Sequence, residues 1–194
     1  VLHISGQLDL TMGGPGIQQF TQTKGPQATP TLDYDAFDWN VAGSGRRSIY
    51  RVVWRGISDP FMESLDFPDL GLLAPKRDFS VSALQALAVY NNDFVLHHSQ
   101  KLAEQLKRDH PAIEEQITNV VRLIYLREPH QDEAAALMSY SQLYGLAATC
   151  RILLNSNEFL FVDSSCTIDH IQSHRRSVDA MYCCGRDSGW VPSA

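Results

Sequence analysis

Carboxylate and guanidinium side chains are concentrated between residues 46 and 77 of this 194-residue chain. Within that segment Arg47 and Arg51 precede three acids, Asp59, Glu63 and Asp66. Paired carboxylates can act as general acid and base, or can bind a cation together with carbonyl oxygens. The alternative is a network of ion pairs and turn caps, because structural networks resemble active sites at the level of sequence. We favour the structural network, and these residues remain the candidate catalytic residues.

A second candidate site lies near the C-terminus. Cys166, His170 and His174 have the spacing C-x3-H-x3-H, with Cys183-Cys184 downstream. Thiolates and imidazoles bind zinc when they are held in a fixed tetrahedral arrangement. No C-x2-C pair accompanies them, and residues 164–194 have no apolar periodicity. We expect this tail to be disordered or aberrant and to hold no metal.

The remaining cysteine and the paired histidines favour structural roles. Cys150 lies in an apolar helical run, where a thiol is buried and inert. His97 and His98 are neighbours on a predicted helix and point about 100° apart, so we expect one to be packed and one to be solvated. The sequence has no C-x-x-C-H haem attachment motif, no G-x-S-x-G and no H-E-x-x-H. We therefore expect no cofactor in this chain.

Helical periodicity dominates the second half of the chain and predicts a mainly α fold. Apolar residues recur at i, i+3 and i+4, and Ser, Asp and Pro mark the ends of the predicted helices. The links are short, so residues 81–160 are predicted to form a compact antiparallel helical bundle. We expect helices over about 81–92, 93–110, 112–126, 131–140 and 143–155, with a short one over 61–65.

The first half is rich in Gly and Pro and predicts an irregular N-terminal arm over residues 1–45. Aromatic residues within 32–39 should dock this arm onto the following domain. Residues 48–55 (SIYRVVWR) and 158–162 (EFLFV) are predicted as short strands from their β-branched and aromatic content. We expect this arm to be part of the module, whose mainly helical portion spans residues 46–163.

Composition limits the function classes. The net charge is −6 and the pI is about 5.6, which argues against a nucleic-acid-binding protein, because such proteins need a basic face. No apolar stretch approaches the roughly 18–20 residues of a membrane span. The chain begins at Val1 without a signal peptide, and we expect it to be the closing part of a longer protein.

Several motifs carry a family resemblance. These are LDLTMGGPG, RRSIYR, DPFMESLDFPD, ALQALAVYNNDFV and LLNSNEFLFVD, which together span most of residues 1–163. The chain resembles the C-terminal module of planctomycete surface proteins, domain of unknown function family 1553. The resemblance implies a long, exported, extracytoplasmic protein, often with a c-type cytochrome domain upstream. Haem c would then belong to the full-length protein, and the partners of this chain would be the upstream domains.

Two functions remain open at this point. The first is an uncharacterised module with a structural or interaction role in a larger exported, haem-containing protein. The alternative is part of an extracytoplasmic enzyme, a hydrolase or oxidoreductase linked to polysaccharide use. Its site would lie at the interface with the upstream part of the protein.

Overall fold

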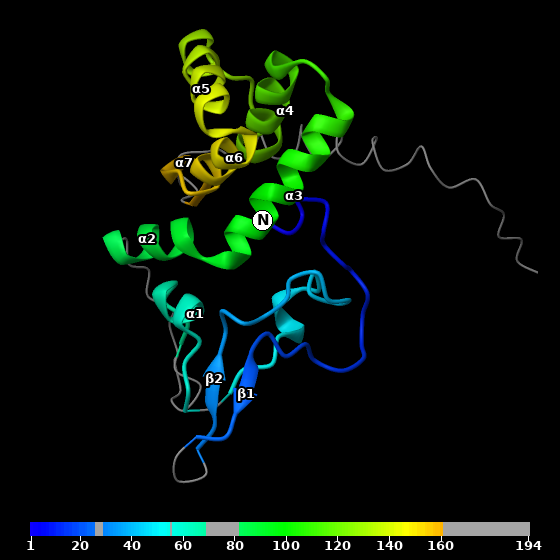
Figure 1. Cartoon of the computed structure of the whole chain (residues 1–194), viewed down its shortest axis with the longest axis vertical. Coiled ribbons are helices and arrows are strands. Elements are labelled where there is room, and N and C mark those ends of the chain that lie inside the picture. Colours follow the sequence, from blue (N-terminus) through cyan, green and yellow to red (C-terminus); the bar gives the residue numbers. More distant parts are fainter. Residues whose placement is uncertain (26–28, 55, 69–81, 161–194) are drawn as a thin grey trace, which may run out of the picture. The chain divides into compact units, whose positions relative to one another are not determined.

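A computed structural model describes residues 1–25, 29–54, 56–68 and 82–160 of the chain. These residues belong to one compact unit, Val1–Leu160. Within it, six helices follow one another after residue 82 (Figure 1), which confirms the mainly α fold class. They are α2 (Ala83–Asn91), α3 (Asp93–Asp109), α4 (Ile113–Tyr125), α5 (Gln131–Tyr144), α6 (Leu146–Leu154) and α7 (Asn157–Leu160).

The helix ends follow local sequence signals. Ser82 caps α2 and forms a reciprocal capping box with Gln85. The cap of α3 is Asn92, whose side chain accepts a hydrogen bond from the Phe94 backbone. Gly145 has a φ of 87° and separates α5 from α6, a conformation that glycine adopts without steric cost.

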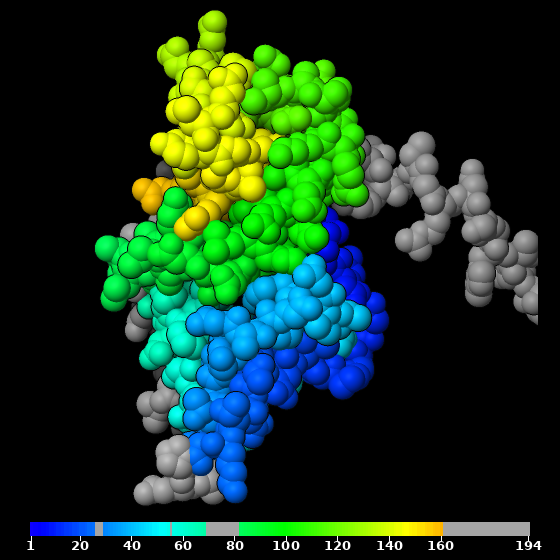
Figure 2. Space-filling view, viewed as in Figure 1, coloured from blue at the N-terminus to red at the C-terminus, as the bar shows by residue number. Residues whose placement is uncertain are grey.

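The core of the bundle comes mainly from one largely apolar buried stripe on each of α3, α4 and α6. In α3, α4 and α6 the fully buried side chains are spaced by three or four residues, as an amphipathic helix requires. Atoms of α3 lie directly against those of α6 (Figure 2). The fully buried apolar side chains of these helices include Val95, Leu102, Ile117, Val120, Val121, Cys150 and Leu154.

One arginine, Arg127, links the ends of the three helices α4, α5 and α7. Arg127 follows the C-terminus of α4 and binds Glu133 in the first turn of α5 through two hydrogen bonds of 2.8 and 3.0 Å. It also binds Glu158 of α7 at 2.7 and 2.9 Å. The adjacent guanidinium, as the main cause, lowers the pKa of Glu133. Leu126, which turns the chain between them, has a left-handed φ of 58°.

The N-terminal arm contains a two-stranded antiparallel sheet of β1 (Thr21–Thr23) and β2 (Thr31–Asp33). Its aromatic residues contact α3, as the sequence predicted. The Trp39 ring lies 5.2 Å from the Phe94 ring, edge to face, and also meets His98. The arm continues into η2, a 3-10 turn over Ser48–Tyr50, and then into the short helix α1 (Pro60–Ser64).

The strand predicted over residues 48–55 is wrong for the residues described. The chain forms η2 there, and then pairs with Ile17 only through a single parallel bridge at Arg51. Ile49 is 81% exposed, so its β-branched side chain is not packed on any sheet face. Strand propensity depends on packing against neighbouring strands, and none is offered here.

The second predicted strand, 158–162, is also wrong over its described part. Residues 157–160 form α7, whose start is fixed by the Ser156 hydroxyl accepting from the Phe159 backbone at 3.2 Å. Glu158 is held by Arg127, and Phe159 packs on the core. Residues 161 and 162 lie outside the described residues. No helix among those described is long and apolar enough to cross a membrane.

Candidate functional site

Asp59 is the most deeply buried carboxylate of the predicted group, with 5% of its surface exposed. One oxygen accepts hydrogen bonds from the backbones of Phe61 (2.9 Å) and Met62 (3.3 Å), which caps α1. The other oxygen pairs with the Arg51 guanidinium. Both oxygens of Asp59 are therefore used by the fold, and neither is free to move a proton for a substrate.

Tyr34 completes the surroundings of this buried pair. Its hydroxyl is buried and has no hydrogen-bond partner among the described residues. Burial is the main cause that raises the pKa of Tyr34, and the charge of Asp59 adds to it. The cavity between Tyr34, Gln19 and the ion pair measures only about 60 Å³, which is too small for a substrate.

A larger pocket is also lined by Asp59. It has a volume of about 270 Å³, and its apolar walls include Trp54, Ile57 and Phe67. Glu63 is exposed at this pocket, and no ion pair or hydrogen bond of its carboxylate occurs in the part of the chain that is described. Because Asp59 is committed elsewhere, this pocket offers one available carboxylate rather than a catalytic pair.

Asp66 connects the end of α1 to α2. Its carboxylate accepts a 2.8 Å hydrogen bond from the Gln85 amide in α2. Its φ of 56° is left-handed, which Asp tolerates better than most residues. Asp66 therefore ends the α1 segment and ties it to α2.

Arg46 fixes the Gly-rich loop that precedes it in the arm. Its guanidinium lies 3.7 Å from the centre of the Tyr50 ring, a cation–π contact. The same group donates to backbone carbonyls of the loop, those of Thr11, Gly13 and Pro15. The Tyr50 hydroxyl accepts from the Gly13 backbone at 2.8 Å, and this bond is the main cause that lowers the pKa of Tyr50.

Arg47 belongs to the same loop cluster but is bonded differently. One terminal nitrogen contacts the thioether sulfur of Met12, and its Nε is buried with no hydrogen-bond partner among the described residues. The structure thus distributes the predicted candidates over several places. It brings Arg51 and Asp59 together and puts Glu63 with Asp59 at the larger pocket, whereas Asp66 binds Gln85 and Arg47 contacts Met12.

A buried Ser–His contact was missed by the sequence analysis. Ser5 Oγ lies 3.1 Å from His98 Nδ1, and both residues are almost fully buried. Burial chiefly, helped by the neighbouring charge of His97, lowers the pKa of His98 to about 4. Without exposure, Ser5 is no accessible nucleophile, and the contact instead anchors the start of the arm on α3. The two residues are 93 positions apart, so no local pattern could have shown it.

The cysteine and histidine candidates from the sequence form no site within the described residues. Burial raises the pKa of Cys150 to about 12, which keeps the thiol protonated and unreactive. Among the residues described, no group of three or more His, Cys, Asp or Glu side chains could hold a metal ion. Cys166, His170 and His174 lie outside the described residues.

Comparison with known proteins decides the family. A family model described as protein of unknown function (DUF1553) matches residues 1–141. The chain belongs to this family. The DUF1553 match covers the arm, the Arg51–Asp59 pair, the Arg46 cluster and the helices as far as α5. No curated protein and no solved structure matches the chain.

Proposed function

We propose that this DUF1553 chain is a non-catalytic module with a structural or interaction role in a larger exported protein. One observation supports this role above the others. Asp59, the buried carboxylate in the segment most typical of the family, uses both oxygens to hold the fold together. A carboxylate whose two oxygens are both bonded within the fold is poorly suited to proton transfer.

The wider context is an expectation from the family resemblance. We propose that the full-length protein is of planctomycete type, is extracytoplasmic, and carries haem c in an upstream domain. The chain has no C-x-x-C-H motif, so residues outside it would attach that haem. The partners of this chain would then be the upstream domains of its own protein.

The test is to express the upstream domains and this 194-residue chain as separate polypeptides and mix them. A structural module should bind and raise the melting temperature of the upstream domains by several degrees, as stabilisation by binding requires. Limited proteolysis of the upstream domains should slow in parallel. Absence of a complex in size-exclusion chromatography, with both parts folded, would refute the proposal.

The pocket beside Glu63 favours a second candidate function. In this reading the chain supplies one face of an enzyme site for polysaccharide-derived material, shared with the upstream part. Glu63→Gln in the full-length protein would then lower turnover of oligosaccharides by about 100-fold, the usual contribution of one general acid or base. Glu104→Gln, an exposed change on α3, is the matched control. Equal turnover in both variants would remove Glu63 as a catalytic residue.

A further inference from the structure

Arg47 has no counter-charge among the described residues. Among the described residues, no carboxylate lies within ion-pair distance of its guanidinium. Its Nε is buried and donates to no atom of those residues. A buried donor left without an acceptor destabilises the protein, so its retention needs a reason.

The edge of the guanidinium formed by Nε and Nη2 is the part that lacks a strong acceptor. Nη2 contacts the sulfur of Met12, and a thioether is a weak acceptor. The Arg47 side chain also interacts with the side chain of Tyr50. Two parallel N–H groups at this spacing match the two oxygens of a carboxylate. Met12 is unbranched and 74% exposed, so its side chain can move aside when such a group arrives.

The neighbouring residues hold this edge in place but do not compete for the ligand. Arg46 donates to loop carbonyls and stacks on Tyr50, which leaves it with little capacity for an anion. The Tyr50 hydroxyl accepts from Gly13 and fixes the loop that carries Met12. A single available edge suits a carboxylate better than a phosphate, which binds best where several donors converge.

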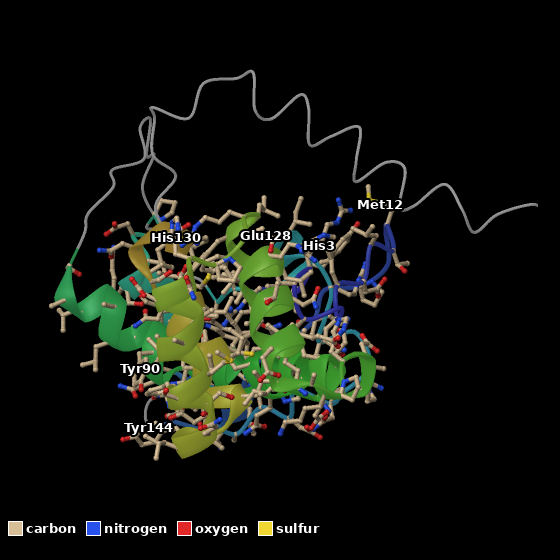
Figure 3. All side chains as sticks on the ribbon, turned by 90° about the horizontal axis from the view of Figure 1, so that it is seen from above. His3, Met12, Tyr90, Glu128, His130 and Tyr144 are labelled. Atoms are coloured by element: carbon tan, nitrogen blue, oxygen red, sulfur yellow. The ribbon has the colours of Figure 1, made fainter. Side chains whose placement is uncertain are left out.

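Exposed apolar side chains lie within two residues of Met12 and of Arg47 along the chain. Ile49 is 81% exposed, Met12 and Leu10 are also highly exposed, and Figure 3 shows Met12 at the outer edge of the ribbon. Arg47, Met12 and Ile49 do not line the two pockets beside Asp59. Small molecules bind in concave sites, whereas exposed apolar side chains around a central arginine are typical of protein interfaces.

We propose that Arg47, with Leu10, Met12 and Ile49, forms a docking surface for a different polypeptide that presents an Asp or Glu among apolar side chains. This inference rests on the proposed role as an interaction module and names the surface it uses. The incoming carboxylate binds the Nε–Nη2 edge of Arg47, and the apolar neighbours of that carboxylate cover Met12 and Ile49. No covalent step is involved.

The experiment uses the complete chain labelled with ¹⁵N and two blocked peptides, acetyl-Leu-Glu-Leu-amide and its Gln counterpart. The Nε–Hε signal of Arg47 is assigned by its loss in Arg47→Lys. We expect the Glu peptide to shift this signal and the Met12 methyl signal saturably, with at least about tenfold tighter binding than the Gln peptide.

Ile49→Ser should weaken binding severalfold with an unchanged melting temperature, which covers the case in which Arg47→Lys fails to fold. The Arg122 signal, from an arginine already paired with Glu128, is the internal control.

Several results would overturn the proposal. They are no shift at Arg47, equal binding of the two peptides, or a larger effect from inorganic phosphate than from the Glu peptide. A dimer in sedimentation that Arg47→Lys abolishes would assign the surface to a second copy of this chain and would also overturn it. Because these assays need no upstream domain, their failure is distinguishable from failure of the mixing experiment above.

Discussion

Residues 1–68 and residues 82–160 are stabilised by different kinds of interaction. Among the described residues, 14 apolar side chains are buried, and all except Phe20 lie between Val89 and Leu154. The N-terminal region instead relies on side chains bonded to backbone, such as Asp59 on α1 and Arg46 on the Gly-rich loop. Two regions of one compact unit therefore respond to different perturbations.

The difference also explains where a partner can act. Apolar packing buries its residues and leaves little for a ligand to contact. Polar bonding is directional and can leave a group unmatched, as at Arg47. In the bundle, by contrast, Arg127 is matched by Glu133 and Glu158. The guanidinium of Arg127 is thus used to hold helices together, whereas that of Arg47 keeps a donor that could bind a partner.

The largest effect is expected from the apolar region. Leu102→Ala removes a side chain with no exposed surface from α3, and should lower the free energy of unfolding by about 3–4 kcal/mol. Leu84→Ala, on the exposed face of α2, is the matched control and should change it by less than about 0.5 kcal/mol. Urea unfolding followed by circular dichroism measures both. Equal effects would show that the core is not where the structure places it.

The corresponding change in the polar region is Asp59→Ala. It removes the cap of α1 and leaves the Arg51 side chain, which is 14% exposed, without its partner, so the free energy of unfolding should fall by about 3 kcal/mol. Glu63→Gln on the same helix should cost less than about 0.5 kcal/mol. If Asp59→Ala were as mild as Glu63→Gln, the pair would be dispensable, and a catalytic role for Asp59 would become the better explanation.

The contact between the two regions should depend on pH through His98. Its pKa is depressed to about 4 in the folded protein and is about 6.5 when unfolded. As the pH falls below about 6.5, His98 takes up a proton in the unfolded chain before it does so in the folded protein. The contribution of His98 to the free energy of unfolding is therefore complete above pH 6.5 and decreases as the pH falls to about 4. The loss amounts to roughly 3 kcal/mol.

Denaturant titrations at several pH values test this dependence. His98→Asn removes the titrating ring. The difference between this variant and the original chain, in the slope of the free energy of unfolding against pH, therefore separates the contribution of His98 from that of the acids. Identical slopes in the two proteins would show that His98 is solvated in solution.

The smallest predicted effect is an increase in stability. Leu126→Gly relieves a left-handed backbone conformation at an exposed side chain and should stabilise the bundle by about 0.5–1 kcal/mol. Leu123→Gly, one turn earlier inside α4, should instead destabilise it by about 1 kcal/mol. Thermal unfolding by calorimetry compares the two. Destabilisation by both would indicate that Leu126 has packing contacts in solution.

Much of the bundle could be predicted because its signals are local. Apolar spacing in α3 and α4 identifies the buried stripes, and Ser82 and Pro111 mark helix ends within one or two residues. The arm could not be predicted in the same way. The residues 48–55 have the composition of a strand, but a strand also needs a neighbour, and the Gly-rich loop supplies only the bridge at Ile17.

The candidate site, like the fold, could be predicted only where its signals are local. Sequence alone determined that acids and arginines are concentrated around Asp59, and that the second half folds as amphipathic helices, because composition and periodicity are properties of neighbouring residues. Only the tertiary structure decided that Asp59 meets Arg51, that Ser5 meets His98, and that Arg47 keeps an unmatched edge. The Ser5–His98 contact and the Arg47–Met12 contact depend on chain segments far apart in sequence, and the choice of partner at each is set by burial and by which acceptors remain unused.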